Sequence, residues 1–225
     1  MNRRRTFFQI LIELALLIIG VLAALAVDNW RQSISEKKMG RDYLINLREA
    51  IEEDTTMIKM EIKRGFDKEN AATQVLQLID SGKTASPEAF EDLIENILML
   101  ANPAFMTAVY EELKSTGNLK LIHNDDIKKN IILYYSYSDL LHIQSSRFVT
   151  YDPDFMDVLD YEEFTYRRPF SQEVILSRLR KSEHARLYLR KLQKDMYLYH
   201  QALIYVTLPK SLELLDKINL GLKSE

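Results

Sequence analysis

The sequence predicts an all-α protein in which one transmembrane helix near the N-terminus is followed by an extramembrane bundle of five to seven helices. Three observations predict this class. Residues 7–27 are almost entirely apolar, Gly and Pro are scarce at six and five in 225 residues, and apolar residues recur at helical rather than strand-like intervals. The chain therefore divides into a short basic tail (residues 1–6), a transmembrane helix (7–27) and a helical extramembrane domain (28–225).

The predicted span reads FFQILIELALLIIGVLAALAV and contains two strongly polar residues, Gln9 and Glu13. A helix of this length rises about 30 Å, which matches the hydrocarbon core of a bilayer. Few helices of soluble proteins are apolar on all sides over such a length. The segment is therefore predicted to cross a membrane rather than to lie in a soluble core.

Basic and aromatic residues flank the span. Arg3, Arg4 and Arg5 precede it, and Trp30 follows it at the level of the lipid headgroups. The arginine-rich tail predicts a cytoplasmic N-terminus and a domain on the exported side, in a periplasm where the host has one. Four basic residues just beyond the span weaken this asymmetry: Arg31, Lys37, Lys38 and Arg41.

A cleaved signal peptide is the main alternative to a retained anchor. The arginines would form its basic start, and Ala24-Leu25-Ala26 would form its small-residue cleavage site. Glu13 counts against this interpretation because it interrupts the apolar middle of the segment. Retention as an anchor is therefore the prediction.

One face of the span is distinctive. Glu13, Leu17, Gly20 and Ala24 are spaced at i, i+4, i+7 and i+11, which places them on one side of a helix. Gly20 and Ala24 form a small-xxx-small pair that permits close approach of another helix. A carboxylate inside a bilayer must extend to the headgroups, take up a proton or find a partner. The face therefore predicts packing against another membrane protein or a second copy.

The helical pattern continues beyond the span without a proline before Pro87, which predicts one long rod with weak points at Gly40 and Gly65. Helix starts are predicted at Ser86-Pro87, Asn102-Pro103, Asn124, Ser171 and Ser182. Helix ends are predicted at the Asp80-Ser81-Gly82-Lys83 turn and at Gly117, and a kink is predicted at Pro209. An apolar face is predicted from Ile127, Ile131, Ile132, Tyr135 and Leu140. Core or interface positions are expected for Tyr134, Tyr137, Tyr188, Tyr197, Tyr199 and Tyr205.

No constellation typical of a catalytic site occurs, so no catalytic residue, metal or cofactor is predicted. Cysteine is absent, which excludes disulfides, thiolate ligands and cysteine nucleophiles. The histidines form no i, i+4 pair, so a metal site would need side chains from distant parts of the chain; they are His123, His142, His184 and His200. The net charge of -3 supplies no basic excess for nucleic acid.

An acidic and a basic run lie in the C-terminal half. Asp152, Asp154 and Asp157 could bind calcium, but the run lacks the glycine turn and terminal glutamate of the familiar calcium loop, so a solvated acidic loop is the preferred interpretation. The basic run could solvate a helix face, pair with the acidic run or dock on anionic lipid, and the first is preferred. Its members are Arg178, Arg180, Lys181, Arg186, Arg190, Lys191 and Lys194.

Two blocks of the sequence resemble a bacterial family of membrane-anchored proteins of unknown function. The first opens with Glu13, has Gly20 in its middle and closes in Asn29-Trp30; the second runs from Tyr110 through Gly117 to the Leu121-Ile122-His123-Asn124 link. The resemblance implies a bacterial source, a retained anchor and a helical domain. It implies no activity, and it covers none of the chain beyond residue 151.

Together these features predict a non-catalytic accessory or structural subunit of the bacterial inner membrane, which binds and stabilises a larger membrane complex. Its expected partners are the lipid bilayer and other membrane protein subunits or a second copy. The alternative is an extracytoplasmic ligand-binding or sensor domain, which would need an apolar pocket with convergent polar groups. An enzyme would need the scattered histidines and acids to meet in one cleft.

Overall fold

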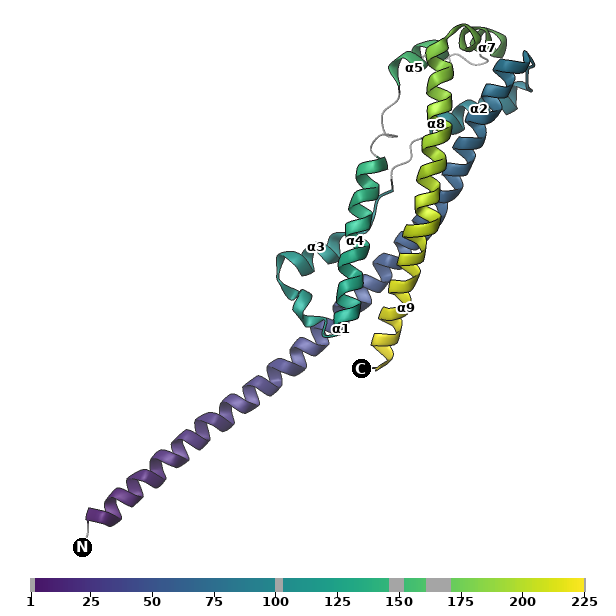
Figure 1. The fold of residues 1–225 in the computed structure, drawn as a ribbon. Coiled ribbons are helices and arrows are strands. Elements are labelled where there is room, and N and C mark those ends of the chain that lie inside the picture. The colour runs from purple at the N-terminus through teal and green to yellow at the C-terminus, as the bar shows by residue number, and fades with distance from the viewer. Residues whose placement is uncertain (1–2, 100–102, 146–151, 161–170, 225) are drawn as a thin grey trace.

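The computed structural model describes residues 3–99, 103–145, 152–160 and 171–224, and every regular element within these ranges is helical (Figure 1). The elements are α1 (Arg3–Ser81), α2 (Pro87–Leu98), α3 (Ala108–Ser115), η1 (Asn118–Leu121), α4 (Asp125–Ser145), α5 (Pro153–Leu159), α7 (Gln172–Lys181), α8 (Glu183–Ala202), η3 (Leu203–Thr207) and α9 (Leu208–Ser224). The predicted all-α class is confirmed for these residues.

Helix α1 is a single rod of 79 residues. At 1.5 Å per residue it extends about 120 Å. The helix continues without a break through Gly40 and Gly65, the two residues predicted to be its weak points. These glycines instead permit close packing: a Cβ on Gly40 would overlap the backbone of Leu121, and a Cβ on Gly65 would lie 3.0 Å from the Cβ of His200.

The second half of α1 carries the helical domain. Helices α8 and α9, joined by η3, run back along α1 in the opposite direction, so the C-terminus lies near the point where α1 leaves the domain (Figure 1). Helices α2, α5 and α7 gather at the end of the domain farthest from the N-terminus, whereas α3, η1 and α4 lie nearer to it. We call these ends distal and proximal.

Each end has its own apolar core, and α1 contributes to both. The distal core includes Ile58, Val75, Phe90, Phe155, Leu176 and Leu189. The proximal core includes Leu44, Leu47, Leu113, Ile131, Tyr135 and Ile218. Phe105 packs against both cores, so the linker before α3 connects the two ends.

Most predicted helix boundaries are confirmed by local hydrogen bonds. The hydroxyl of Ser86 accepts from Ala89 N, and that of Ser182 accepts from Ala185 N. The amide oxygen of Asn124 accepts from Ile127 N at the start of α4. Gly82 and Gly117 have φ values of +72° and +71°, which suits glycine after a helix end.

Two expectations for the middle of the chain are wrong. No helix begins at Pro103; residues 103–107 are non-helical and α3 begins at Ala108, while Asn102 lies outside the described residues. The face predicted for α4 is too wide, because Ile132 and Leu140 are 40% and 55% exposed. The buried side of α4 includes Ile127, Ile131 and Tyr135, and α4 packs against α9. Ile132 and Leu140 lie beside this buried side and stay exposed.

The irregularity predicted at Pro209 lies just before that residue. Residues 203–207 form a π-helix, in which Leu208 N donates to Leu203 O, five residues back. Since proline has no N–H to donate, a widened turn before it redistributes the backbone bonds and lets the helix continue. The chain from α8 to α9 therefore stays helical.

Candidate functional site

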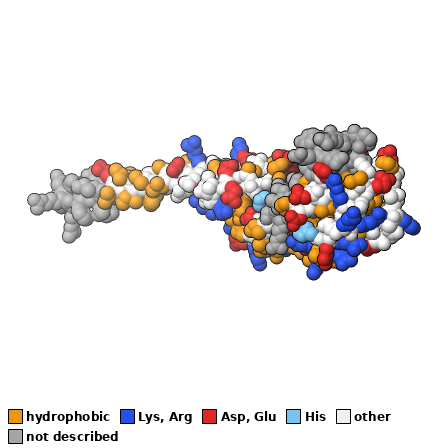
Figure 2. Space-filling view, turned by 90° about the horizontal axis from the view of Figure 1, so that it is seen from above, with side chains coloured by type: hydrophobic (Ala, Val, Ile, Leu, Met, Phe, Trp, Pro, Cys, Tyr) orange, Lys and Arg blue, Asp and Glu red, His pale blue; other side chains and the backbone are white. Residues whose placement is uncertain are grey.

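The N-terminal part of α1 projects from the domain as a bare helix. No described side chain from Glu13 to Met39 is buried, and the first buried residue is Gly40. Figure 2 shows this part as a narrow rod with hydrophobic side chains along it. Among the described residues, α1 is the one helix long and apolar enough to cross a membrane. None of the residues in its most apolar stretch is buried by the rest of the structure.

The predicted partner face lies on this projecting part. Glu13, Leu17, Gly20 and Ala24 are all exposed, and a Cβ on Gly20 would meet no atom within 4 Å. The face therefore offers a shallow track with room for a second helix, and the domain itself does not occupy it. Trp30 is 65% exposed at the end of the apolar stretch. The side chains of Arg3, Arg4 and Arg5 lie outside the described residues.

A basic hollow of about 500 Å³ lies where α1 enters the domain. It is lined by Lys37, Lys38 and Arg41 of α1, by His123 of the link before α4, and by Leu222 of α9. A guanidinium nitrogen of Arg41 donates to the carbonyl of Leu222 over 2.9 Å, which ties the C-terminal turn of α9 to α1. This hollow joins residues that are more than eighty positions apart, so sequence reasoning did not find it.

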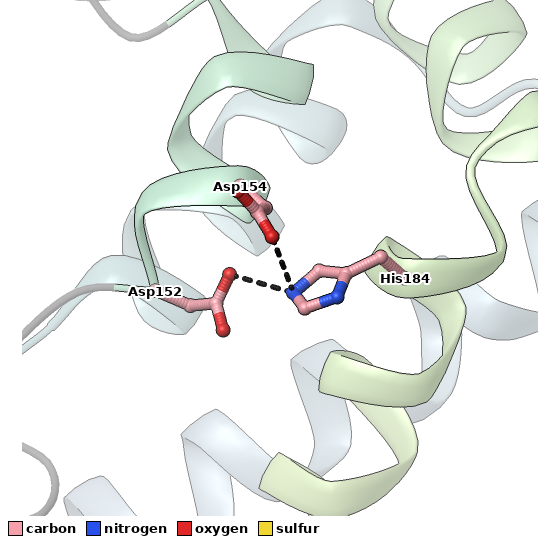
Figure 3. A group of neighbouring side chains, drawn as sticks. All are labelled: Asp152, Asp154 and His184. Carbon is pink, nitrogen blue, oxygen red and sulfur yellow. Dashed lines mark hydrogen bonds and ion pairs between the residues drawn. The ribbon is translucent and has the colours of Figure 1, made fainter.

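Asp152, Asp154 and His184 form a cluster at the distal end (Figure 3). The Nε2 atom of His184 lies 2.9 Å from Asp152 and 3.6 Å from Asp154. Their ligand atoms all lie within 4.8 Å of one another. Of the three aspartates considered as calcium ligands, Asp157 is not part of the cluster, and the loop preferred for this run is wrong because residues 153–159 form helix α5.

The chemistry of this cluster favours a hydrogen-bonded contact between two helices over a metal centre. Asp152 is the N-cap of α5 and accepts from Phe155 N at 2.9 Å, while His184 stands in the first turn of α8. Helix N-termini carry partial positive charge, which opposes a cation. Burial raises the pKa of Asp152, but hydrogen bonds from Phe155 N and His184 outweigh it and hold that pKa below its usual range. The cluster therefore connects α5 to α8.

A buried network centred on Asp54 was not predicted. One oxygen of Asp54 accepts from Met106 N at 2.8 Å and the other from the Tyr134 hydroxyl at 2.9 Å. Tyr135 donates to Met106 O at 3.2 Å, and its ring stacks on Tyr110. Burial raises the pKa of Asp54 despite these bonds. The network holds the linker before α3 against α1.

An open surface hollow of about 630 Å³ adjoins Asp54. Its lining is acidic and rich in methionine, and consists of Glu49, Glu52, Glu53, Asp54, Thr56, Met57, Met60, Ala104 and Met106. Each oxygen of Asp54 already accepts one hydrogen bond from within the protein.

A second buried polar group is His200, where α8 crosses α1. It is 1% exposed, its ring stacks on Phe66 with centroids 4.1 Å apart, and its Nδ1 lies 3.3 Å from a carboxylate oxygen of Glu69. Its Nε2 has no hydrogen-bond partner among the described residues. Burial lowers the pKa of His200, opposed by the charge of Glu69.

The basic run lies in α7 and α8, in the distal part of the domain (Figure 1). Arg178 pairs with Asp160 at 3.1 Å and Arg186 with Asp80 at 2.6 Å, while Arg180 donates to backbone carbonyls. Pairing with the acidic run, which extends to Asp160, is therefore confirmed for Arg178, whereas Arg186 pairs with an aspartate of α1 outside that run. Tyr134, Tyr135 and Tyr199 are buried, whereas Tyr197 and Tyr205 are exposed.

No protein-family model, curated protein or solved structure matches this chain. The resemblance of residues 13–30 and 110–124 to a bacterial membrane-anchored family therefore has no support beyond those residues, and the bacterial source stays a prediction.

Proposed function

We propose that this chain is a single-span membrane protein that serves as a non-catalytic accessory subunit. Its span packs against a helix of a larger membrane complex, and its helical domain stands outside the bilayer. One observation carries this proposal: the apolar part of α1 extends from the domain with none of its surface covered. Each large aliphatic side chain gains about 1.5–3 kcal/mol on leaving water, so this segment belongs in lipid or against a partner.

The continuity of α1 gives the anchor a defined geometry. From Val27, the last residue of the apolar stretch, to Gly40, the first buried residue, the helix rises about 20 Å. Headgroups occupy the first part of that distance, beside Trp30, so the domain would stand just clear of them. Because the domain extends along α1, its basic distal helices would point away from the same bilayer. Lipid docking through Arg178 to Lys194 is therefore not part of the proposal.

The face of the span suits a protein partner. A carboxylate such as Glu13 is costly among lipid chains and is stabilised when another helix supplies a donor. Gly20 and Ala24 leave room for that helix to approach closely. Contact with lipid tails alone does not explain these small side chains, because larger apolar side chains suit lipid equally well. The proposed place of the anchor is the inner membrane of a bacterium, with the domain on the periplasmic side.

The anchor is tested with the full chain in bacterial membranes. Alkaline extraction should leave the protein in the membrane pellet, and Ile18→Arg with Ile19→Arg should release it, because two central cations oppose insertion. The intact mass should correspond to the whole 26.4 kDa chain. A mature protein that begins after Ala26 would identify a signal peptide and overturn the anchor.

The accessory role is tested by purification from the native membrane in mild detergent through a C-terminal tag. Named subunits should co-purify in fixed ratio, and Glu13→Leu or Gly20→Leu should weaken the complex. Ala15→Leu is the control for Gly20→Leu, since it also creates a leucine but on the opposite side of the helix. A lone monomer in every detergent, unchanged by these substitutions, would contradict the role.

A further inference from the structure

The partner face of α1 continues beyond the span into the aqueous part of the helix. Alternating steps of four and three residues connect the residues Glu13, Leu17, Gly20, Ala24, Val27, Arg31, Ile34, Lys38 and Arg41. This is the spacing of the a and d positions of a coiled coil, so these side chains follow one gently winding line. We call this line the α1 seam. It begins in the span and ends at the helical domain.

The described domain leaves the α1 seam open from Glu13 to Lys38, and Arg41 at its end donates to the carbonyl of Leu222. Each of its residues is exposed, including Ile34, which is 50% exposed in the part of α1 that follows Trp30. An apolar residue at a seam position in water is unfavourable unless another surface covers it. The next turn of α1 differs in its exposure, because Gly40 and Leu44 are buried against the domain.

Two surface hollows lie along the seam. The first, about 420 Å³, is lined by Ala23, Ala24, Val27, Asp28 and Arg31 at the end of the apolar stretch. The second is the basic hollow that includes Lys38 and Arg41. His123 and Leu222 of the domain line this hollow together with the residues of α1, so the seam meets the domain there. A helix lying along α1 would therefore end at this hollow.

The charge along the seam changes with position. The part within the span is apolar apart from Glu13, whereas Arg31, Lys38 and Arg41 make the aqueous part basic, with Lys37 beside them. A second copy of the chain, parallel in the same membrane, would place each of these charges opposite its own counterpart. Like charges at facing positions are destabilising and act against self-association.

We infer that the α1 seam receives a transmembrane helix of a different protein whose segment just outside the bilayer is helical and acidic. The inference rests on the proposed function and specifies the partner. The partner helix packs on Gly20 and Ala24 within the membrane, covers Ile34 outside it, and places carboxylates opposite Arg31 and Lys38. Its end lies in the basic hollow against His123 and Leu222.

A photo-crosslinking amino acid at position 34 of the full chain, in native membranes, tests this inference. The matched control places it at Gln32, which is exposed and lies two residues away, on the opposite side of the helix. Crosslinking through position 34 should yield one membrane protein, with the crosslink mapped by mass spectrometry to an acidic segment next to a transmembrane helix. Position 32 should yield little.

Charge reversal supplies the second arm. Lys37→Glu with Lys38→Glu should lower the yield at position 34 at least about fivefold, since both attractions become repulsions. Lys191→Glu with Lys194→Glu makes the same change in net charge in α8 and should leave the yield unchanged. Equal membrane levels of both double variants show that neither fails to fold. Higher salt should lower the wild-type yield.

The outcomes separate this inference from the proposed function. Crosslinks to lipid, to a second copy, or equally from both positions would overturn the inference, as would a yield insensitive to the charge reversal. If named subunits still co-purify and respond to Gly20→Leu, the accessory role stands without it. If nothing co-purifies and nothing crosslinks, both fail.

Discussion

Single buried polar residues secure the contacts between α1 and the rest of the domain. Asp54 is 1% exposed, and its two oxygens receive hydrogen bonds from a backbone N–H and a tyrosine hydroxyl. His200 is equally buried but keeps one ring nitrogen without a partner among the described residues. Both oxygens of Asp54 have a hydrogen-bond donor, whereas one ring nitrogen of His200 has no partner among the described residues. The two residues should therefore respond differently to mutation and to pH.

Tyr134→Phe should destabilise the domain by about 1–3 kcal/mol, because it leaves a buried oxygen of Asp54 without its donor. Tyr135→Phe is the control: it removes a hydrogen bond to the carbonyl of Met106 and should cost less, since no carboxylate loses a partner. Thermal unfolding of the full chain in detergent, followed by circular dichroism, measures both. Equal losses in the two variants would contradict the role of Asp54.

His200 should make the stability of the domain depend on pH. Burial holds its folded-state pKa below the ordinary 6.5, so the unfolded chain takes up this proton first as the pH falls. Stability is therefore complete above about pH 6.5 and decreases as the pH falls through and below that value. His200→Phe, which keeps a ring beside Phe66, should reduce this decrease in melting temperature between about pH 7.5 and about pH 5.5. An unchanged pH dependence would assign it to another group.

At the scale of elements, α1 serves as the scaffold on which the others are placed. Its glycines differ in what they face: Gly40 lies against the backbone of Leu121 in η1, whereas Gly20 faces open space. Short helices are held by capping and by side chains from distant helices, as where Asp152 caps α5 and meets His184 of α8. Both kinds of contact can be tested by single substitutions with controls in the same chain.

Gly40→Ala should destabilise the proximal end by about 1–3 kcal/mol, because the added methyl forces η1 away from α1. Gly20→Ala introduces the same group where no atom lies within 4 Å, and should leave the melting temperature in detergent unchanged. Both substitutions raise helix propensity equally, so the difference between them reports the contact with Leu121. A Gly40→Ala protein as stable as wild type would show that η1 can shift freely.

Asp152→Ala should cost about 0.5–2 kcal/mol through loss of the cap on α5, whereas Asp154→Ala should cost less because that side chain caps nothing. The folded-state pKa of Asp152 is lowered, so its contribution is present above its unfolded value of 3.8 and is lost as the pH falls through the folded value. Melting temperatures of both variants check this. A rise in wild-type melting temperature with Zn²⁺, removed by both substitutions, would instead identify a metal site.

For the whole molecule, the rod-like continuity of α1 links the apolar N-terminal segment to the far end of the domain. The N-terminal segment and the distal helices lie at opposite ends of the same long axis (Figure 1). With the proposed anchor in a membrane, its orientation would decide the compartment of every element beyond residue 40 together. Because the chain has no cysteine, a single introduced thiol can report that compartment.

Glu88→Cys places an exposed thiol in the first turn of α2, in the distal part of the domain. In bacterial spheroplasts a membrane-impermeant maleimide should label it, because the arginine-rich tail favours a cytoplasmic N-terminus. Asn2→Cys in the tail should be labelled after the membrane is permeabilised. The reverse pattern would place the domain in the cytoplasm.

Much of the secondary structure was predictable because its causes are local. Ser86, Asn124 and Ser182 cap helices through atoms three residues away, and Gly117 ends one through its own backbone conformation. The apolar stretch ending at Val27 was equally predictable from composition, because it has no polar face with which it could lie on the surface of a soluble domain. The exception, the non-helical segment after Pro103, arises where a distant carboxylate binds Met106 N.

By itself, therefore, the sequence determined the helical class, the long rod, the apolar segment and most helix ends, because each depends on neighbours within a turn or two. Only the tertiary structure decided which polar residues meet. Tyr134 reaches Asp54 across 80 positions, and His184 reaches Asp152 across 32. It also decided that Lys38 and His123 share a hollow at the end of the partner face. Such pairs depend on how the helices cross and are rotated about their axes, which is set by packing and carries no local signal in the chain.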